Sequence, residues 1–199
     1  MQIKTTLSAL AVSLALLSTG AHASIISFDS LEQSGSGYQF MSSYTEDGFQ
    51  LTSTSNSFGS AQQSNAGWYF GSASLFNNTG GATTTLAPIG GSTFTLNSID
   101  LAPVSQSWGL GATISFVGHL NGGGTVNQSF TVDDGYFFQT FALIGFTNLD
   151  SVTWDQASPY HQFDNIVINA ANVPEPFTAL LVGLALTGLG LARRKASAK

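Results

Sequence analysis

The chain has 199 residues, contains no cysteine, and carries eleven acidic against five basic residues, a net charge of −6. This length fits one globular domain with additional segments, and the missing cysteines exclude disulfide bonds, a thiol nucleophile and a cysteine-ligated zinc site. The acidic balance argues against a nucleic-acid partner, because binding to phosphates requires clustered lysines and arginines.

Residues 1–23 have the three parts of a secretory signal peptide. Lys4 gives a positive start, an apolar run follows from Leu7 to Leu17, and Ala21 and Ala23 form a small-residue A-x-A site. The alternative is a retained membrane anchor, but the apolar run of 11 residues is too short to span a bilayer. We therefore expect export, with cleavage by signal peptidase after Ala23.

The charges are unevenly distributed along the chain. None of the basic residues lies between Ser24 and Asn172, whereas ten acids do. No ion pair with a lysine or arginine can form inside this segment, so each carboxylate has to be solvated, hydrogen-bonded or bound to a cation. We interpret most of the acids as turn residues on an exported surface. The alternative is that two or three of them hold Ca²⁺.

Residues 24–172 predict one all-β domain, an antiparallel β-sandwich or jelly roll. Polar residues alternate with β-branched and aromatic ones, a period of two that is typical of half-buried strands. The alternating stretches are residues 82–86, 93–101, 113–117, 126–132, 138–141, 152–154 and 163–168. Turn residues such as 121–124 separate them. We expect about eight to ten strands around one core, and residues 53–67 predict a long loop because they are rich in Ser, Asn, Gln and Gly.

The opening strand reads Ile25 to Asp29, and the closing strand contains the sequence Phe163 to Ile166. This pairing resembles jelly-roll carbohydrate-binding modules, in which an FD strand and an FDNI strand bracket the sandwich. The resemblance implies that Asp29 and Asp164 could share one structural Ca²⁺, an ion that needs six to eight oxygen ligands. The alternative is that each carboxylate accepts backbone N–H bonds at a strand end.

No catalytic constellation stands out in the domain. His119 and His161 lack a metal-ligand spacing, and no G-x-S-x-G elbow is present. Asp133 and Asp134 are adjacent and precede Gly135, which favours a turn over a glycosidase pair. We therefore expect a protein that is not an enzyme. The less favoured alternative is a secreted hydrolase, in which a histidine would meet an acid from another strand.

Aromatic residues in loops are the stronger functional signal. Sugar rings stack on exposed aromatic faces, and polar neighbours fix their orientation. Trp108, Trp68 and Tyr160 lie beside small residues or a proline, and they are our candidates for glycan contact, with Trp108 as the first. Burial is the alternative for each of them. Trp154 alternates with Val152, which predicts that it lies in the core.

The tail, residues 173–199, has three parts in order. A proline-containing motif cannot continue a helix, an uncharged apolar stretch follows at 177–192, and a basic cluster comes after it. A helix over these 16 apolar residues would span about 24 Å, which suits a single transmembrane helix with snorkelling ends. The basic cluster would stay on the cytoplasmic side. The motif is Val173, Pro174, Glu175 and Pro176, and the cluster is Arg193, Arg194 and Lys195.

This tail closely resembles the PEP-CTERM sorting signal of Gram-negative bacteria, and the opening and closing strands are similar to those of other PEP-CTERM ectodomains. The resemblance implies processing by an exosortase, a membrane transpeptidase, and delivery to the cell surface or extracellular matrix, where such proteins are linked to exopolysaccharide and biofilm. We therefore expect an exported, transiently anchored, non-catalytic protein with weak polysaccharide binding. A structural or self-associating coat protein is the alternative, and for the tail a plain membrane anchor is the alternative.

Overall fold

The computed structural model describes residues 23–34, 39–62, 68–104, 111–135 and 137–169. The predicted signal peptide, the sorting tail and Trp108 lie outside these ranges. Within them, no helix is long and apolar enough to cross a membrane.

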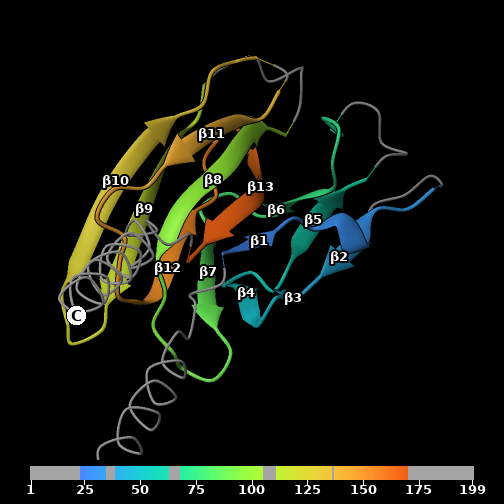
Figure 1. Ribbon diagram of the computed structural model, residues 1–199. Coiled ribbons are helices and arrows are strands. Elements are labelled where there is room, and N and C mark those ends of the chain that lie inside the picture. The colour runs from blue at the N-terminus through green and yellow to red at the C-terminus, as the bar shows by residue number, and fades with distance from the viewer. Residues whose placement is uncertain (1–22, 35–38, 63–67, 105–110, 136, 170–199) are drawn as a thin grey trace, which may run out of the picture.

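Two antiparallel sheets packed face to face form the domain, as the sequence predicted (Figure 1). Sheet A runs in the order β11 (Gln139–Ala142), β8 (Leu96–Pro103), β13 (His161–Ile168), β6 (Ser74–Asn77), β5 (Phe58–Ala61) and β2 (Gln39–Met41), and β1 (Ser24–Ile26) pairs with β13. Sheet B runs in the order β10 (Thr125–Thr131), β9 (Thr113–Leu120), β12 (Leu149–Asp155), β7 (Thr83–Pro88), β4 (Phe49–Ser53) and β3 (Ser43–Glu46).

The strand count and one loop differ from the expectation. The described ranges contain thirteen strands, more than the sequence predicted, because several strands have only three or four residues. Residues 53–67 were predicted as a loop, yet they include β5 (Phe58–Ala61). All four residues of β5 are buried, as are those of its neighbour β6. A strand covered on both faces shows no alternation, so its sequence does not resemble a half-buried strand.

The opening strand is also shorter than predicted. It ends at Ile26, and Phe28 takes a left-handed conformation with φ of 56° before the 3-10 helix η1 (Asp29–Leu31). The Glu46 carboxylate stabilises this bend, because it accepts the Phe28 backbone N–H at 3.1 Å and the Tyr44 hydroxyl at 2.8 Å. Asp29 therefore leaves the strand and lies exposed on η1.

The core fills the space between the inner faces of the sheets. Trp154 from sheet B is only 2% exposed, which confirms the prediction, and its ring centre lies 5.1 Å from that of Phe163 in sheet A. Phe28 and Phe58 pack edge-on against the same Phe163 ring. Burial of one such side chain contributes about 1.5–3 kcal/mol to the free energy of unfolding.

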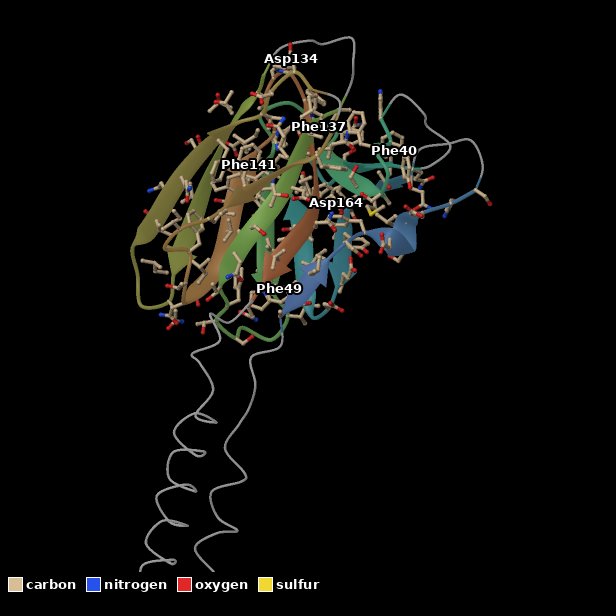
Figure 2. The ribbon with its side chains drawn as sticks, turned by 45° about the horizontal axis from the view of Figure 1, so that its top comes forward. Phe40, Phe49, Asp134, Phe137, Phe141 and Asp164 are labelled. Atoms are coloured by element: carbon tan, nitrogen blue, oxygen red, sulfur yellow. The ribbon has the colours of Figure 1, made fainter. Side chains whose placement is uncertain are left out.

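The two ends of the described chain lie side by side, because Ser24 on β1 pairs with Ile168 on β13. Phe49 lies near this end of the sandwich, whereas Phe40, Phe137 and Asp134 lie at the opposite end (Figure 2). The segments that precede and follow the domain therefore both attach at the end away from these three residues.

Candidate functional site

A short segment, residues 68–72, crosses the outer face of sheet A, and we call it the strap. On β13 the Phe163 side chain points into the core, so Gln162 and Asp164 point to the outer face. Both are nevertheless fully buried. Gln162 Nε2 donates to the Trp68 carbonyl oxygen at 3.0 Å, and the Ser72 hydroxyl donates to Asp164 Oδ2. The strap therefore covers these two polar side chains.

A hydrogen-bonded network joins the acids beneath the strap. Asp164 on β13 is the register partner of Asp100 on β8. The Asn165 side chain connects them, because its Nδ2 donates to Asp100 Oδ2 at 3.0 Å while its backbone N–H donates to Asp164 Oδ1 at 2.7 Å. Thr140 on β11 donates to the other Asp100 oxygen at 2.5 Å. Residues of three strands, β8, β11 and β13, thus form one hydrogen-bonded polar network.

Burial, together with the nearby negative charges of Asp100 and Asp29, raises the pKa of Asp164 to about 7. The hydrogen bonds from Ser72 and Asn165 act in the opposite direction, because they favour the charged form. At neutral pH a substantial fraction of the molecules therefore holds Asp164 as an uncharged carboxylic acid, which can both donate and accept hydrogen bonds.

Aromatic contacts hold the strap at both of its sides. The Trp68 ring packs edge-on against Phe76, with centres 5.6 Å apart. Phe76 in turn lies over Gly59, where a Cβ atom would come within 2.4 Å of the ring. On the other side the Phe70 and Phe138 rings are 6.1 Å apart. The strap is thus packed on sheet A on one side and on the loop before β11 on the other.

Two large aromatic side chains flank this strap and face solvent. Phe40 on β2 is 60% exposed and Phe137 is 57% exposed, and both lie at the end opposite the termini (Figure 2). Phe40 is the register partner of Gly59, and Phe137 precedes the Phe138 that packs on the strap. Sequence reasoning missed both. Because neighbouring residues of an extended chain point to opposite sides, the Phe137-Phe138 pair could have indicated one exposed ring.

The tryptophan and tyrosine candidates have different surroundings. Trp68 is half-buried on the strap. Tyr160 is also half-buried, and its hydroxyl accepts the Gly80 backbone N–H at 2.8 Å. Tyr160 therefore has a hydrogen-bonding role in the turn at Gly80, whereas Trp68 belongs to the strap and its aromatic contacts.

β1, which leads into the 3-10 helix that carries Asp29, pairs with β13, which carries Asp164. The two acids are close enough for the Asp29 charge to raise the pKa of Asp164. However, both Asp164 oxygens and both Asp100 oxygens already accept protein hydrogen bonds. Among the described residues, no group of three or more acids or histidines is arranged to hold a metal ion. The Asp29–Asp164 ion therefore stays a prediction.

The histidines have no carboxylate partner in the described part of the chain. Burial lowers the pKa of His161 to about 3, and its Nδ1 lies 3.2 Å from Gln156 Nε2. The His119 ring lies 3.3 Å from the Thr153 hydroxyl. Asp133 and Asp134 are exposed beyond the end of β10, as the turn interpretation predicted. The residues described here thus place His161 and His119 beside an amide and a hydroxyl.

No protein-family model matches the chain, and no curated protein matches it. Among solved structures, a family 29 carbohydrate-binding module is similar, with 12% identity over 74% of this chain and 87% of that chain and a TM-score of 0.37. A CBM29-2 variant complexed with mannohexaose shows 12% identity, 75% and 92% coverage and a TM-score of 0.38. A variant complexed with cellulohexaose shows 12% identity, 74% and 89% coverage and a TM-score of 0.36. Likeness at this level carries no inference, so we argue the function from this chain's own residues.

Proposed function

We propose that the domain is a non-catalytic module that binds polysaccharide weakly at the cell surface or in the extracellular matrix. The observation that carries this proposal is the pair of exposed rings, Phe40 and Phe137, on either side of the strap. Phe40 and Phe137 each present a large exposed ring on which an apolar part of a ligand can pack. Trp68 on the strap is half-buried and is the third aromatic residue of the proposed site.

The chemistry of this surface suits a sugar chain. The apolar C–H faces of sugar rings pack on aromatic rings, while their hydroxyl groups need donors and acceptors nearby. Asp100 and Asn165 are half-buried beside the strap and offer both kinds of group. Residues 24–172 contain ten acids and no lysine or arginine, so the domain would repel an anionic polymer. We therefore assign a neutral polysaccharide as the ligand class.

A glycan array probed with the full chain in detergent tests this assignment. We expect Phe40→Ala, Phe137→Ala and Trp68→Ala each to weaken binding by about three- to tenfold, the value of one aromatic contact. Ile89→Ala is the matched control, because Ile89 is 57% exposed like Phe137 but bonds to Gly48 at the opposite end.

Trp108→Ala extends the same test to the first candidate from the sequence, which lies outside the described residues. Unchanged glycan binding in the Phe40 and Phe137 variants would remove the proposed site, whatever Trp108 contributes. A hydrolase would be recognised by turnover that His119→Ala or His161→Ala abolishes, and we expect no such turnover.

We also propose that the chain is exported and then processed by an exosortase-type transpeptidase. The order of motif, apolar stretch and basic cluster in residues 173–199 supports this. The arrangement of the domain agrees with it, because both ends lie away from Phe40 and Phe137 and the exposed rings would point away from a membrane anchor.

Intact mass of the protein from the surface and medium of its native host tests the processing step. The expected mass lacks residues 1–23 and the tail beyond residues 173–176. A mass that lacks only the signal peptide would mean that the tail is a permanent anchor.

A further inference from the structure

Strand β10 (Thr125–Thr131) is a long and unprotected edge of sheet B. It pairs with β9 over all seven residues without a register shift, and in the described residues no other strand pairs with it. Figure 1 shows it at the margin of the sandwich. Such an edge presents a row of unpaired backbone N–H and C=O groups that can pair with another strand.

The other sheet edges are shorter or carry charge. The opposite edge of sheet B, β3, has four residues, ends in Glu46 and precedes Asp47. The edges of sheet A, β11 and β2, have four and three residues. Proteins usually protect a long edge with a charged residue, a proline or a bulge. The sequence of β10, TVNQSFT, has none of these.

An exposed isoleucine is hydrogen-bonded to the middle residue of this edge strand. The central residue of β10 is Gln128, whose Oε1 accepts the Ile144 backbone N–H at 2.9 Å and whose Nε2 donates to the Ala142 carbonyl oxygen at 3.3 Å. Ile144 is 78% exposed, more than Phe40, Phe137, Ile89 or Ile25. The Ile144 backbone is therefore bonded to the central side chain of the edge strand, and the Ile144 side chain is exposed.

We propose that two copies of the chain associate by antiparallel pairing of β10 with β10 about a two-fold axis at Gln128. This pairing sets Asn127 of each copy opposite Ser129 of the other and brings the two Ile144 side chains toward the axis. The outward hydroxyls of β10 already form cross-strand pairs with β9, at 2.9 Å for Thr113–Thr131 and 2.8 Å for Ser115–Ser129. The second copy would continue this ladder on the other side.

Charge favours a second copy at this edge over other parts of the surface. The domain is acidic throughout, so two copies repel each other wherever their acids meet. β10 contains no acid, and Asp133 lies beyond the end of the strand. A two-fold interface is self-complementary by construction, because each copy offers the same strand. The edge thus combines low charge, free backbone groups and an exposed Ile144.

Thiol cross-linking tests the pairing, since the chain has no cysteine of its own. Ser129→Cys places one thiol on the outward face of β10, and Ser43→Cys is the matched control on β3, an exposed serine on the same face at the opposite edge. Each full chain is treated with a short bismaleimide in excess detergent, so that micelles outnumber chains. We expect a cross-linked dimer for Ser129→Cys only. Equal dimer yields from both variants, or none from either, would overturn the proposal.

Added charge provides an independent test that leaves the fold intact. Asn127→Asp with Ser129→Asp brings carboxylates opposite each other across the axis, which destabilises strand pairing. We expect the association constant of the dimer to fall by about tenfold, equivalent to about 1.4 kcal/mol. Ser43→Asp with Thr45→Asp adds the same charge at the β3 edge and should leave the dimer unchanged.

Ile144→Ser and Ile89→Ser form a second matched pair of exposed isoleucines. Only the Ile144 variant is expected to lose dimer, and equal loss in both would contradict the interface. All of these variants leave Phe40, Phe137 and the strap untouched. The glycan-binding proposal and the dimer proposal can therefore be contradicted independently of each other.

Discussion

The two outer faces of the sandwich differ in what lies on them. On sheet A, the strap covers Gln162 and Asp164, and aromatic rings pack over Gly59 and Phe76. On sheet B, the outward residues of β9 and β10 are mostly Ser and Thr, and they are exposed or half-buried. Hydroxyl pairs such as Ser115–Ser129 are exposed on that face. The outer face of sheet A is therefore covered where the strap crosses it, whereas the outer face of sheet B remains solvated.

This contrast explains where the unusual chemistry occurs. A carboxyl group on a bare sheet face stays solvated, but the strap removes water from Asp164 and shifts its pKa. A covered face also needs a hydrogen-bond partner for each polar atom, and Ser72, Asn165 and Thr140 supply partners to the acids. Changes on the face of sheet A should therefore cost far more stability than matched changes on sheet B.

The largest expected effect is for Phe76→Ala. Phe76 is on the outer face of sheet A but only 2% exposed, so its truncation leaves a cavity under Trp68 and should lower the free energy of unfolding by about 3–5 kcal/mol. Thr85→Ala on the outer face of sheet B should cost about 1 kcal/mol or less. Urea denaturation followed by tryptophan fluorescence measures both. Similar costs for the two variants would mean that the strap does not seal its face.

Two buried titratable groups should give the molecule opposing pH dependences. The folded state raises the pKa of Asp164 from 3.8 to about 7, so its contribution to stability is complete below pH 3.8 and is lost as the pH rises through 7. The folded state lowers the pKa of His161 from 6.5 to about 3, so its contribution is complete above pH 6.5 and is lost as the pH falls through 3. Between pH 3.8 and pH 6.5 the contributions of Asp164 and His161 to stability change with pH in opposite directions.

Single substitutions separate the pH dependence of stability that Asp164 causes from the one that His161 causes. Relative to the native chain, Asp164→Asn should become more stable as the pH rises from 3.8 toward 7, by at most about 1.4 kcal/mol per pH unit. His161→Gln should become relatively more stable as the pH falls from 6.5 toward 3, with a similar limit. Unfolding free energies at intervals of one pH unit measure these differences. A flat difference curve for Asp164→Asn would show that the strap leaves this carboxyl solvated.

The strands of sheet B, whose outer face is solvated, were the easier ones to predict from the sequence. β9, β10 and β12 alternate between core and solvent, and residues 113–117, 126–132 and 152–154 were expected as strands on that basis. The same rule also found Trp154 in the core. β4 alternates equally well, since Phe49, Leu51 and Ser53 are buried between exposed residues. The alternation rule therefore applies to β4 as well.

The covered face could not be predicted in the same way. β5 and β6 consist largely of small and polar residues that are all buried. Phe58 and Leu75 face the core, whereas Phe76 is on the outer face and packs against Trp68 of the strap. The sequence did single out Asp164 and Trp68, but as parts of an ion site and a glycan contact. It could not indicate that Trp68 and Ser72 lie over Gln162 and Asp164, because these contacts join residues about 90 positions apart.

A smaller effect is expected for Ser72→Ala, which removes the hydrogen bond from the strap to Asp164. Loss of a partner to a buried carboxyl costs about 1–3 kcal/mol, whereas Ser115→Ala on sheet B removes an exposed pair worth about 0.2–1 kcal/mol. The Ser72 hydroxyl lowers the pKa of Asp164, so it favours the charged form. The cost of Ser72→Ala should therefore be larger above pH 7 than at pH 4, and a cost independent of pH would contradict this contact.

The smallest effect is expected for Tyr69→Phe, at the rim of the strap. The Tyr69 hydroxyl donates to Glu32 Oε1 at 2.8 Å, but the pair is exposed, so its loss should change the free energy of unfolding by about 0.5 kcal/mol or less. Burial and then Glu32 raise the pKa of Tyr69, and Glu32→Gln should lower it in a spectrophotometric titration. If Tyr69→Phe cost as much as Ser72→Ala, the strap would be held at its solvent rim. The burial of Asp164 would then result from the strap, and the bond to Asp164 would not be what holds the strap in place.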